Sequence, residues 1–151
     1  MNIKSIYAFV TLFSSMTAAY AAPNDLKIER EQVIKQYVMD LQSADAQDIS
    51  ALFEDKGIVI STSKGKVNAT DFFYSFFPAI ESAHTELHQL FINNTDDGRY
   101  AARFHFNFKL KDNEEGDGEY VDEFVFANNS SKLIAVYMFE NLKFDNLAPI
   151  K

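Results

Sequence analysis

The chain reads Arg99-Tyr-Ala-Ala-Arg-Phe-His-Phe-Asn-Phe-Lys-Leu110, then an acidic stretch with two glycines, then Glu119-Tyr-Val-Asp-Glu-Phe-Val-Phe126 and Lys132-Leu-Ile-Ala-Val-Tyr-Met-Phe139. Apolar and polar residues alternate with a period of two in these runs, which predicts strands with two different faces. One face is strongly aromatic, and Asp122 lies in its middle. The pattern therefore predicts a curved sheet around an apolar interior that contains one carboxyl group.

The segment before these strands has the spacing of helices. Residues 23–43 carry one apolar stripe, formed by Val33, Ile34, Tyr37, Val38 and Leu41. We expect Asp45 to cap a short second helix and Asn68 to cap a third, phenylalanine-rich helix that Pro78 kinks or ends. The strands are predicted at 57–61, 85–93, 99–110, 118–127 and 132–140, with no internal repeat or domain linker between them.

Two local motifs suggest a family. The run Ser43-Ala-Asp-Ala-Gln-Asp-Ile-Ser-Ala-Leu-Phe-Glu-Asp-Lys-Gly-Ile-Val59, and Gly65 followed by Asp71-Phe-Phe73, resemble the first-strand entry and the glycine turn of the nuclear-transport-factor-2-like (SnoaL-like) superfamily. One departure is Val67-Asn68, where a second glycine is usual. The resemblance covers about residues 28–142. It implies an α+β cone, a curved antiparallel sheet wrapped around N-terminal helices with an internal apolar pocket. It names no activity, because the superfamily includes isomerases, dehydratases, cyclases and non-catalytic proteins.

The N-terminus has the order of a signal peptide. Lys4 supplies a positive charge, Ile6 to Met16 is an apolar run too short to span a bilayer, and Ala19-Tyr20-Ala21 is a small-x-small cleavage site. The alternative is an apolar first helix of the domain. We expect a signal peptide at 1–21, a SnoaL-like domain at 22–142 and a C-terminal tail at 143–151. Export of a chain without cysteine favours a bacterial periplasmic or secreted protein.

The charge of the chain limits its partners. The net charge is −8, and lysine and arginine form no cluster. Binding to a phosphate backbone needs a basic surface, so nucleic acid is not an expected partner, and no second segment is apolar enough to span a membrane. The sequence also lacks a glycine-rich phosphate loop, a cysteine nucleophile and a Gly-x-Ser-x-Gly elbow. No cofactor is therefore predicted.

Histidines and carboxylates alternate on one predicted strand. His84, Glu86 and His88 share a face, and His105, paired with Glu123, is expected to lie near His88. Imidazole and carboxylate are zinc ligands, but this spacing is not that of the helical His-Glu-x-x-His motif. A solvated polar face is the favoured interpretation, so no metal site is predicted.

The hairpin loops suggest how the aromatic face is assembled. If Lys111 pairs near Asp117, then Phe106 faces Asp122, and continuing through the next turn places Asp122 opposite Tyr137. We expect this face to line a pocket for a small apolar or aromatic molecule. The aromatic residues predicted to contact that ligand are Phe104, Phe106, Tyr120 and Phe124.

Asp122 and Tyr137 are the candidate catalytic residues. A carboxylate in an aromatic cavity is desolvated, which raises its pKa and suits it to act as a general base. A neighbouring phenol is able to orient the carboxylate or to stabilise an oxyanion. The alternative is that Tyr137 hydrogen-bonds Asp122 and the pair has only a structural role.

The favoured function is non-catalytic, because no complete catalytic set is present. The sequence predicts an exported ligand-binding or interaction module. The alternative is an enzyme of the isomerase, dehydratase or cyclase kind that uses Asp122 as general base with Tyr137.

The apolar residues on both faces of the last strand predict that the protein forms an oligomer. Leu133, Ala135, Tyr137 and Phe139 are expected to face the interior, yet the residues of the opposite face are also apolar. These outer residues are Ile134, Val136 and Met138, joined by Val121 and Val125 of the neighbouring strand. An exposed apolar patch of this kind usually marks a contact surface, so we predict a homodimer through the last two strands. The open alternative is that residues 142–150 fold back over the patch.

Overall fold

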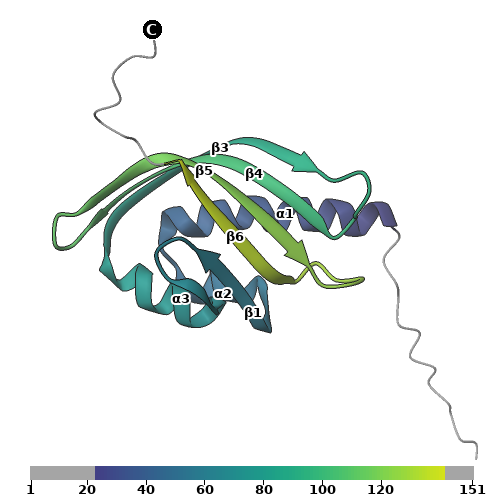
Figure 1. Cartoon of the computed structure of the whole chain (residues 1–151), viewed down its shortest axis with the longest axis horizontal. Helices are drawn as coiled ribbons and strands as arrows, with labels where there is room; N and C mark the ends of the chain where they lie inside the picture. The colour runs from purple at the N-terminus through teal and green to yellow at the C-terminus, as the bar shows by residue number, and fades with distance from the viewer. Residues whose placement is uncertain (1–22, 142–151) are drawn as a thin grey trace, which may run out of the picture.

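A computed structural model of the protein describes residues 23–141. Within them, three α-helices, one 3-10 helix and a six-stranded sheet of order β2-β1-β6-β5-β4-β3 form one α+β unit (Figure 1), which confirms the predicted fold class. The elements are α1 (Pro23–Ser43), α2 (Ala46–Ala51), β1 (Phe53–Ser61), β2 (Gly65–Asn68), α3 (Ala69–Phe76), η1 (Phe77–Ala79), β3 (Ile80–Ile92), β4 (Arg99–Leu110), β5 (Glu115–Phe126) and β6 (Leu133–Asn141).

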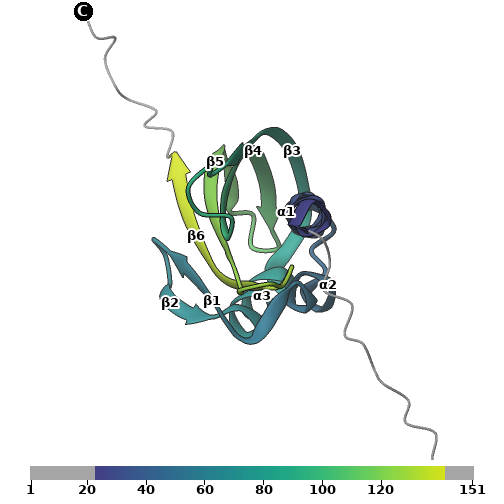
Figure 2. The same ribbon diagram turned by 90° about the vertical axis from the view of Figure 1, so that its right-hand side faces the viewer.

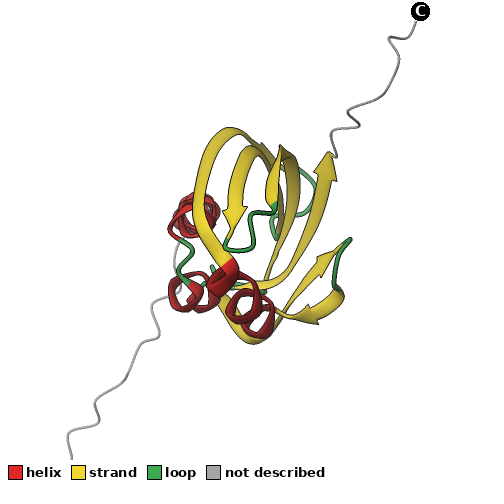
Figure 3. Cartoon of the chain, turned by 90° about the vertical axis from the view of Figure 1, so that its left-hand side faces the viewer, coloured by secondary structure: helices red, strands yellow, loops and turns green. Residues whose placement is uncertain are grey.

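The sheet is strongly curved, and the helices lie on its concave side. Figure 2 shows α1 end-on beside β3, with α2 and α3 below it, and Figure 3 shows the helices gathered on one side of the curled strands. The core between them is rich in aromatic rings. Its largest fully buried hydrophobic side chains are Tyr37, Phe73, Phe104, Phe124, Ile34, Ile49, Leu133, Val59 and Val136. No helix in residues 23–141 is long and apolar enough to cross a membrane.

The predicted helix boundaries are confirmed where a capping residue fixes them. The Asp45 side chain accepts hydrogen bonds from the backbone nitrogens at the start of α2, and Asn68 does the same for α3. These bonds satisfy donors that have no partner inside the helix. Helix α3 ends at Phe76, and Pro78 lies in the following 3-10 helix, because proline cannot donate a backbone hydrogen bond to continue an α-helix.

The sheet differs from the prediction at its β1 edge. Strand β1 begins at Phe53 instead of Gly57 and pairs with β6 in parallel, so the sheet is mixed and not wholly antiparallel. A register shift between Phe53 and Ile58 interrupts that pairing. Strand β2, at Gly65–Asn68, was not predicted.

The predicted register between β4 and β5 is wrong by four residues. Phe106 pairs with Gly118, and Asp122 pairs with Ala102. The turn is earlier than expected because Asn113 takes a positive φ of 71° and the Asp112 carboxylate accepts from the backbone nitrogen of Glu114 at 3.1 Å. Since the shift is an even number, Asp122 still shares its face with the aromatic residues.

The predicted register between β5 and β6 is wrong by one residue, which has a larger effect. An irregularity between Val125 and Phe126 shifts the pairing, so that Asp122 lies opposite Met138 and Glu123 lies opposite Tyr137. A shift of one residue exchanges the two faces of a strand. The inward residues of β6 are therefore Val136 and Met138, whereas the residues predicted there, Ala135, Tyr137 and Phe139, face outward.

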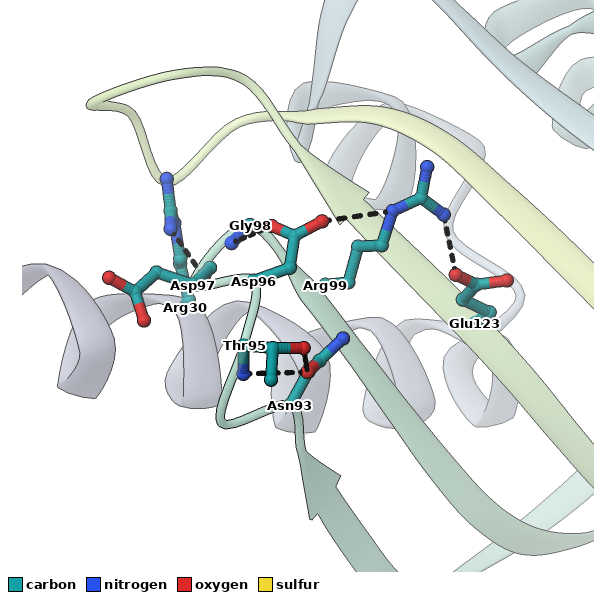
Figure 4. Close-up of polar contacts among 8 residues, drawn as sticks. All are labelled: Arg30, Asn93, Thr95, Asp96, Asp97, Gly98, Arg99 and Glu123. Carbon is teal, nitrogen blue, oxygen red and sulfur yellow. Dashed lines mark hydrogen bonds and ion pairs between the residues drawn. The ribbon is translucent and has the colours of Figure 1, made fainter.

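A single buried arginine connects α1 to the loops at one end of the sheet. Arg30 is only 4% exposed, and its guanidinium donates to the backbone oxygens of Asp97 at 2.7 Å, Ala127 at 2.9 Å and Ser130 at 2.9 Å. It also lies 5.2 Å from the centre of the Phe126 ring. Figure 4 shows Arg30 against the β3–β4 loop. The planar guanidinium thus holds two loops in one position.

The end of α1 contains a buried carboxyl group. Asp40 is 3% exposed and accepts from Gln36 Nε2 at 2.6 Å, but its Oδ2 atom has no hydrogen-bond partner among the described residues. Burial raises the pKa of Asp40, as do the charges of Asp48 and Asp45, while the bond from Gln36 opposes the shift. The folded protein therefore disfavours the ionised form of Asp40.

We predict that Asp40→Asn stabilises the protein at neutral pH. A group whose pKa is raised by folding binds protons more tightly in the folded state, so its contribution to stability falls as the pH rises above the ordinary value of 3.8. The variant should gain about 1 kcal/mol at pH 7, and the gain should disappear near pH 4. Thermal unfolding at both pH values measures this, with the exposed Asp55→Asn as control. A destabilised variant at pH 7 would contradict the prediction.

Candidate functional site

A cavity of about 730 Å³ opens between the concave face of the sheet, α1, α3 and the β1–β2 turn. Its volume is in the range of small-molecule sites in proteins. The wall is largely aromatic, with Phe72 and Phe76 on α3 and with Phe104, Phe106, Phe108 and Tyr120 on the sheet. The cavity therefore offers an apolar surface that a flat or branched hydrocarbon is able to contact on several sides.

Asp122 is the most deeply buried acidic residue of the cavity. It lies on β5 and is 1% exposed, and the Tyr37 hydroxyl on α1 donates to its Oδ2 atom at 3.2 Å. Burial raises the pKa of Tyr37 well above its ordinary value, and the charge of Asp122 raises it further. The phenol therefore stays protonated and acts as a donor to the carboxyl group. The Tyr37 ring is held edge-on by Phe124 at 5.0 Å.

The prediction that Tyr137 shares a face with Asp122 is wrong. Tyr137 lies opposite Glu123 on the outer side of the sheet, because of the one-residue shift in β6. Tyr37 occupies the position beside Asp122 that was expected for Tyr137. The sequence pattern assigned Tyr37 only to the apolar stripe of the first helix, so its contact with Asp122 was not predicted. A signal was present, since the hydroxyl of a fully buried tyrosine usually has a partner, and Asp122 was the carboxyl group predicted for the interior.

Three of the four aromatic residues predicted to contact a ligand line the cavity. Phe104, Phe106 and Tyr120 form its sheet wall, whereas Phe124 is fully buried behind Tyr37 and does not reach it. Phe104 and Tyr120 are paired residues on neighbouring strands, and their rings stack at 5.7 Å with an angle of 13°. This pair forms a flat apolar surface beside Asp122.

Gly116 determines the shape of the cavity rim. It pairs with Phe108, and a Cβ atom at position 116 would lie only 2.3 Å from the Phe108 ring. The ring therefore lies directly on the glycine backbone, where it also contacts Phe76 at 5.4 Å and Phe106 at 4.9 Å. Any larger residue at position 116 has to displace Phe108.

The rim also carries the charged groups of the site. Glu114 and Glu115 line it from the β4–β5 hairpin, as does Asp117, whose carboxylate is paired with His105, and Lys64 lines it from the β1–β2 turn. Two hydroxyl groups, of Ser61 and Ser63, lie on the same side as Lys64. A ligand entering the cavity therefore passes a mainly acidic rim.

The histidines lie on the outer face of the sheet. His105 contacts Glu119 at 3.2 Å and Asp117 at 2.7 Å, not the predicted partner Glu123, and His88 contacts Glu119 at 3.3 Å. Partial burial acts to raise the pKa of Glu119, but His105 and His88 lower it below its ordinary value. In residues 23–141, no three His, Asp or Glu side chains are arranged to hold a metal ion.

The chain is similar to solved structures. No family model matches it, and no curated protein matches it. The epoxide hydrolase/cyclase-like enzyme SalBIII aligns over 77% of this chain and 93% of its own, with a TM-score of 0.63 and 15% identity. A putative isomerase from Bacillus subtilis aligns over 77% and 88%, with a TM-score of 0.64 and 8% identity.

A ketosteroid isomerase-like protein from Erwinia carotovora atroseptica aligns over 80% of this chain and 99% of its own, with a TM-score of 0.61 and 13% identity. Identities this low show the fold and not the activity. Together with the curved sheet around α1, they establish that the chain has the nuclear-transport-factor-2-like, or SnoaL-like, fold that the sequence motifs predicted.

Proposed function

We propose that this protein is an exported module that binds a small apolar or aromatic molecule in the cavity of its sheet. The observation that carries the proposal is a cavity of about 730 Å³ whose aromatic wall closes on a buried Asp122–Tyr37 pair. A cavity that only filled space during folding would be expected to collapse, because empty apolar volume costs stability.

The chemistry of the wall suits such a ligand. Burial of apolar surface contributes about 25 cal/mol per Å², and aromatic rings add favourable stacking geometry. A few polar groups at the base of an apolar pocket fix the orientation of the bound molecule. Asp122 and Tyr37 are the buried polar pair of this cavity, and the single hydroxyl proton of Tyr37 is donated to Asp122.

The enzymatic alternative gains no support of its own. General acid–base catalysis by Asp122 needs a second group beside the substrate, and Tyr137, the residue predicted for that role, lies on the other face of the sheet. The catalytic role predicted for Asp122 stays a prediction. Binding without chemistry requires only the groups that the cavity contains.

We predict that Gly116→Ala weakens binding of the uncharged dye Nile red. The added methyl group drives Phe108 towards the cavity, and overpacking of about 1 kcal/mol corresponds to about a fivefold loss of affinity. Fluorescence titration measures the dissociation constant. Gly98→Ala, in the β3–β4 loop at the other end of the sheet, is the matched control and should bind like the wild type. Absence of Nile red binding by the wild type, or equal loss in both variants, would refute the pocket.

We further propose that the outer face of β5 and β6 forms a two-fold interface with a second copy of the chain. The corrected register places Val121, Ile134 and Phe139 on this face, and they are 38%, 42% and 55% exposed. Tyr137 lies among them. Exposed apolar side chains grouped in this way usually mark a contact surface. The alternative cover, residues 142–150, lies outside the described part of the chain.

If the protein forms this dimer, Phe139→Lys should produce a monomer. A charge in the centre of an apolar interface cannot be buried without a partner, so association should be lost while the fold is kept. Light scattering over a range of protein concentrations measures the mass. Phe91→Lys, a change at a position that is 42% exposed on the distant strand β3, should leave the mass unchanged. A wild-type protein that remains monomeric at high concentration would exclude the dimer.

Export rests on the N-terminal sequence alone, since residues 1–21 lie outside the described part. We expect cleavage after Ala21 and a mature protein that begins at Ala22 in a bacterial periplasm or medium. N-terminal sequencing after expression in an export-competent host tests this. A folded product that still begins with Met1 would count against export.

A further inference from the structure

We propose that the ligand of the cavity is an amphiphile that binds with its hydrocarbon end at the base of the cavity and its polar end at the mouth. This inference rests on the proposed binding function and specifies the class and the orientation of the ligand. It follows from the way in which polar groups are distributed between the base, the wall and the mouth of the cavity.

The polar groups at the base are already engaged within the protein. Tyr37 has a single hydroxyl proton, which it donates to Asp122 Oδ2 at 3.2 Å. Asp122, at 1% exposure, and Tyr120 each take part in a further interaction. As far as residues 23–141 form it, the base therefore presents neither a spare donor nor an open acceptor to a ligand.

The wall above this pair is apolar. It is formed by phenylalanine, leucine and methionine side chains of α1, α3 and the sheet, among them Leu41, Phe72, Phe106 and Met138. A hydroxyl or carbonyl group carried to this depth loses its water and finds no replacement partner, which is unfavourable. A hydrocarbon group gains by leaving water, so the inner end of the ligand should be hydrocarbon.

The mouth offers the polar contacts that the base does not. Lys64 from the β1–β2 turn and Glu114 and Glu115 from the β4–β5 hairpin line it and are exposed, and Ser63 adds a hydroxyl group. These side chains include both donors and acceptors, and water reaches them. A polar end held here keeps its hydration or exchanges it for hydrogen bonds. The orientation of the ligand is therefore set at the mouth.

Two isomeric, uncharged probes test this orientation. In 4-phenylbutane-1,2-diol both hydroxyl groups lie at one end, whereas 4-(4-hydroxyphenyl)butan-1-ol carries one hydroxyl group at each end. Isothermal titration calorimetry of the full chain gives their affinities, and displacement of Nile red shows that they occupy the same cavity. We expect the diol to bind at least about tenfold more tightly, because its isomer has to bury one hydroxyl group without a partner.

Tyr37→Phe locates the effect at the base. The change removes the hydroxyl group that donates to Asp122 and opens an acceptor position that a ligand hydroxyl group is able to fill. The isomer with a hydroxyl group at each end should then bind at least about fivefold more tightly than it binds the wild type, while the diol stays within about twofold. Tyr100→Phe, the same change at a buried tyrosine outside the lining of this cavity, should leave both affinities unchanged.

The outcomes distinguish this inference from the proposed function, and the wild-type comparison decides it even if Tyr37→Phe does not fold. Equal affinities, or tighter binding of the isomer with a hydroxyl group at each end, overturn the orientation and leave the binding function standing. A preference that stays as large in a folded Tyr37→Phe variant overturns the role given to the Tyr37–Asp122 pair. If neither Nile red nor either isomer binds, the proposed function fails, and the inference fails with it.

Discussion

The hydrogen bond between Tyr37 and Asp122 joins the long helix to the middle of the sheet, and the interior is arranged around it. It connects α1 to β5, two elements separated by 85 positions in the chain. A buried carboxyl group without a donor would be costly, so α1 has to lie where its phenol reaches β5. The cavity occupies the space between α1, α3 and the strands around Asp122.

The faces of the strands were predictable, but their alignment was not. A period of two assigns Asp122 and Phe104 to one side without reference to any partner strand. Register depends on where the turn closes, and the two glycines that suggested the turn instead lie in β5, where Gly116 makes room for the Phe108 ring and Gly118 pairs with Phe106. Gly116 was therefore misread, because a glycine beneath an aromatic ring and a glycine in a turn look alike in sequence.

Features that depend on residues close together in the sequence were predicted well. Contacts between distant segments were predicted poorly. Asp45 and Asn68 cap helices through bonds to residues two and three positions away, which sequence shows directly. The parallel pairing of β1 with β6 and the irregularity after Val125 arise from packing between remote segments. For the same reason the carboxyl group of the site was identified and its phenol partner was not.

Part of the cavity boundary is formed by backbone and by the exposed hairpin between β4 and β5, away from the tightly packed centre around Phe73 and Tyr37. Substitutions at the exposed residues Glu114 and Glu115 therefore change the charge of the entrance without disturbing the buried residues that specify the fold. Such a separation makes ligand preference evolvable, since sequence drift in one surface segment gives related proteins different ligands on an unchanged scaffold.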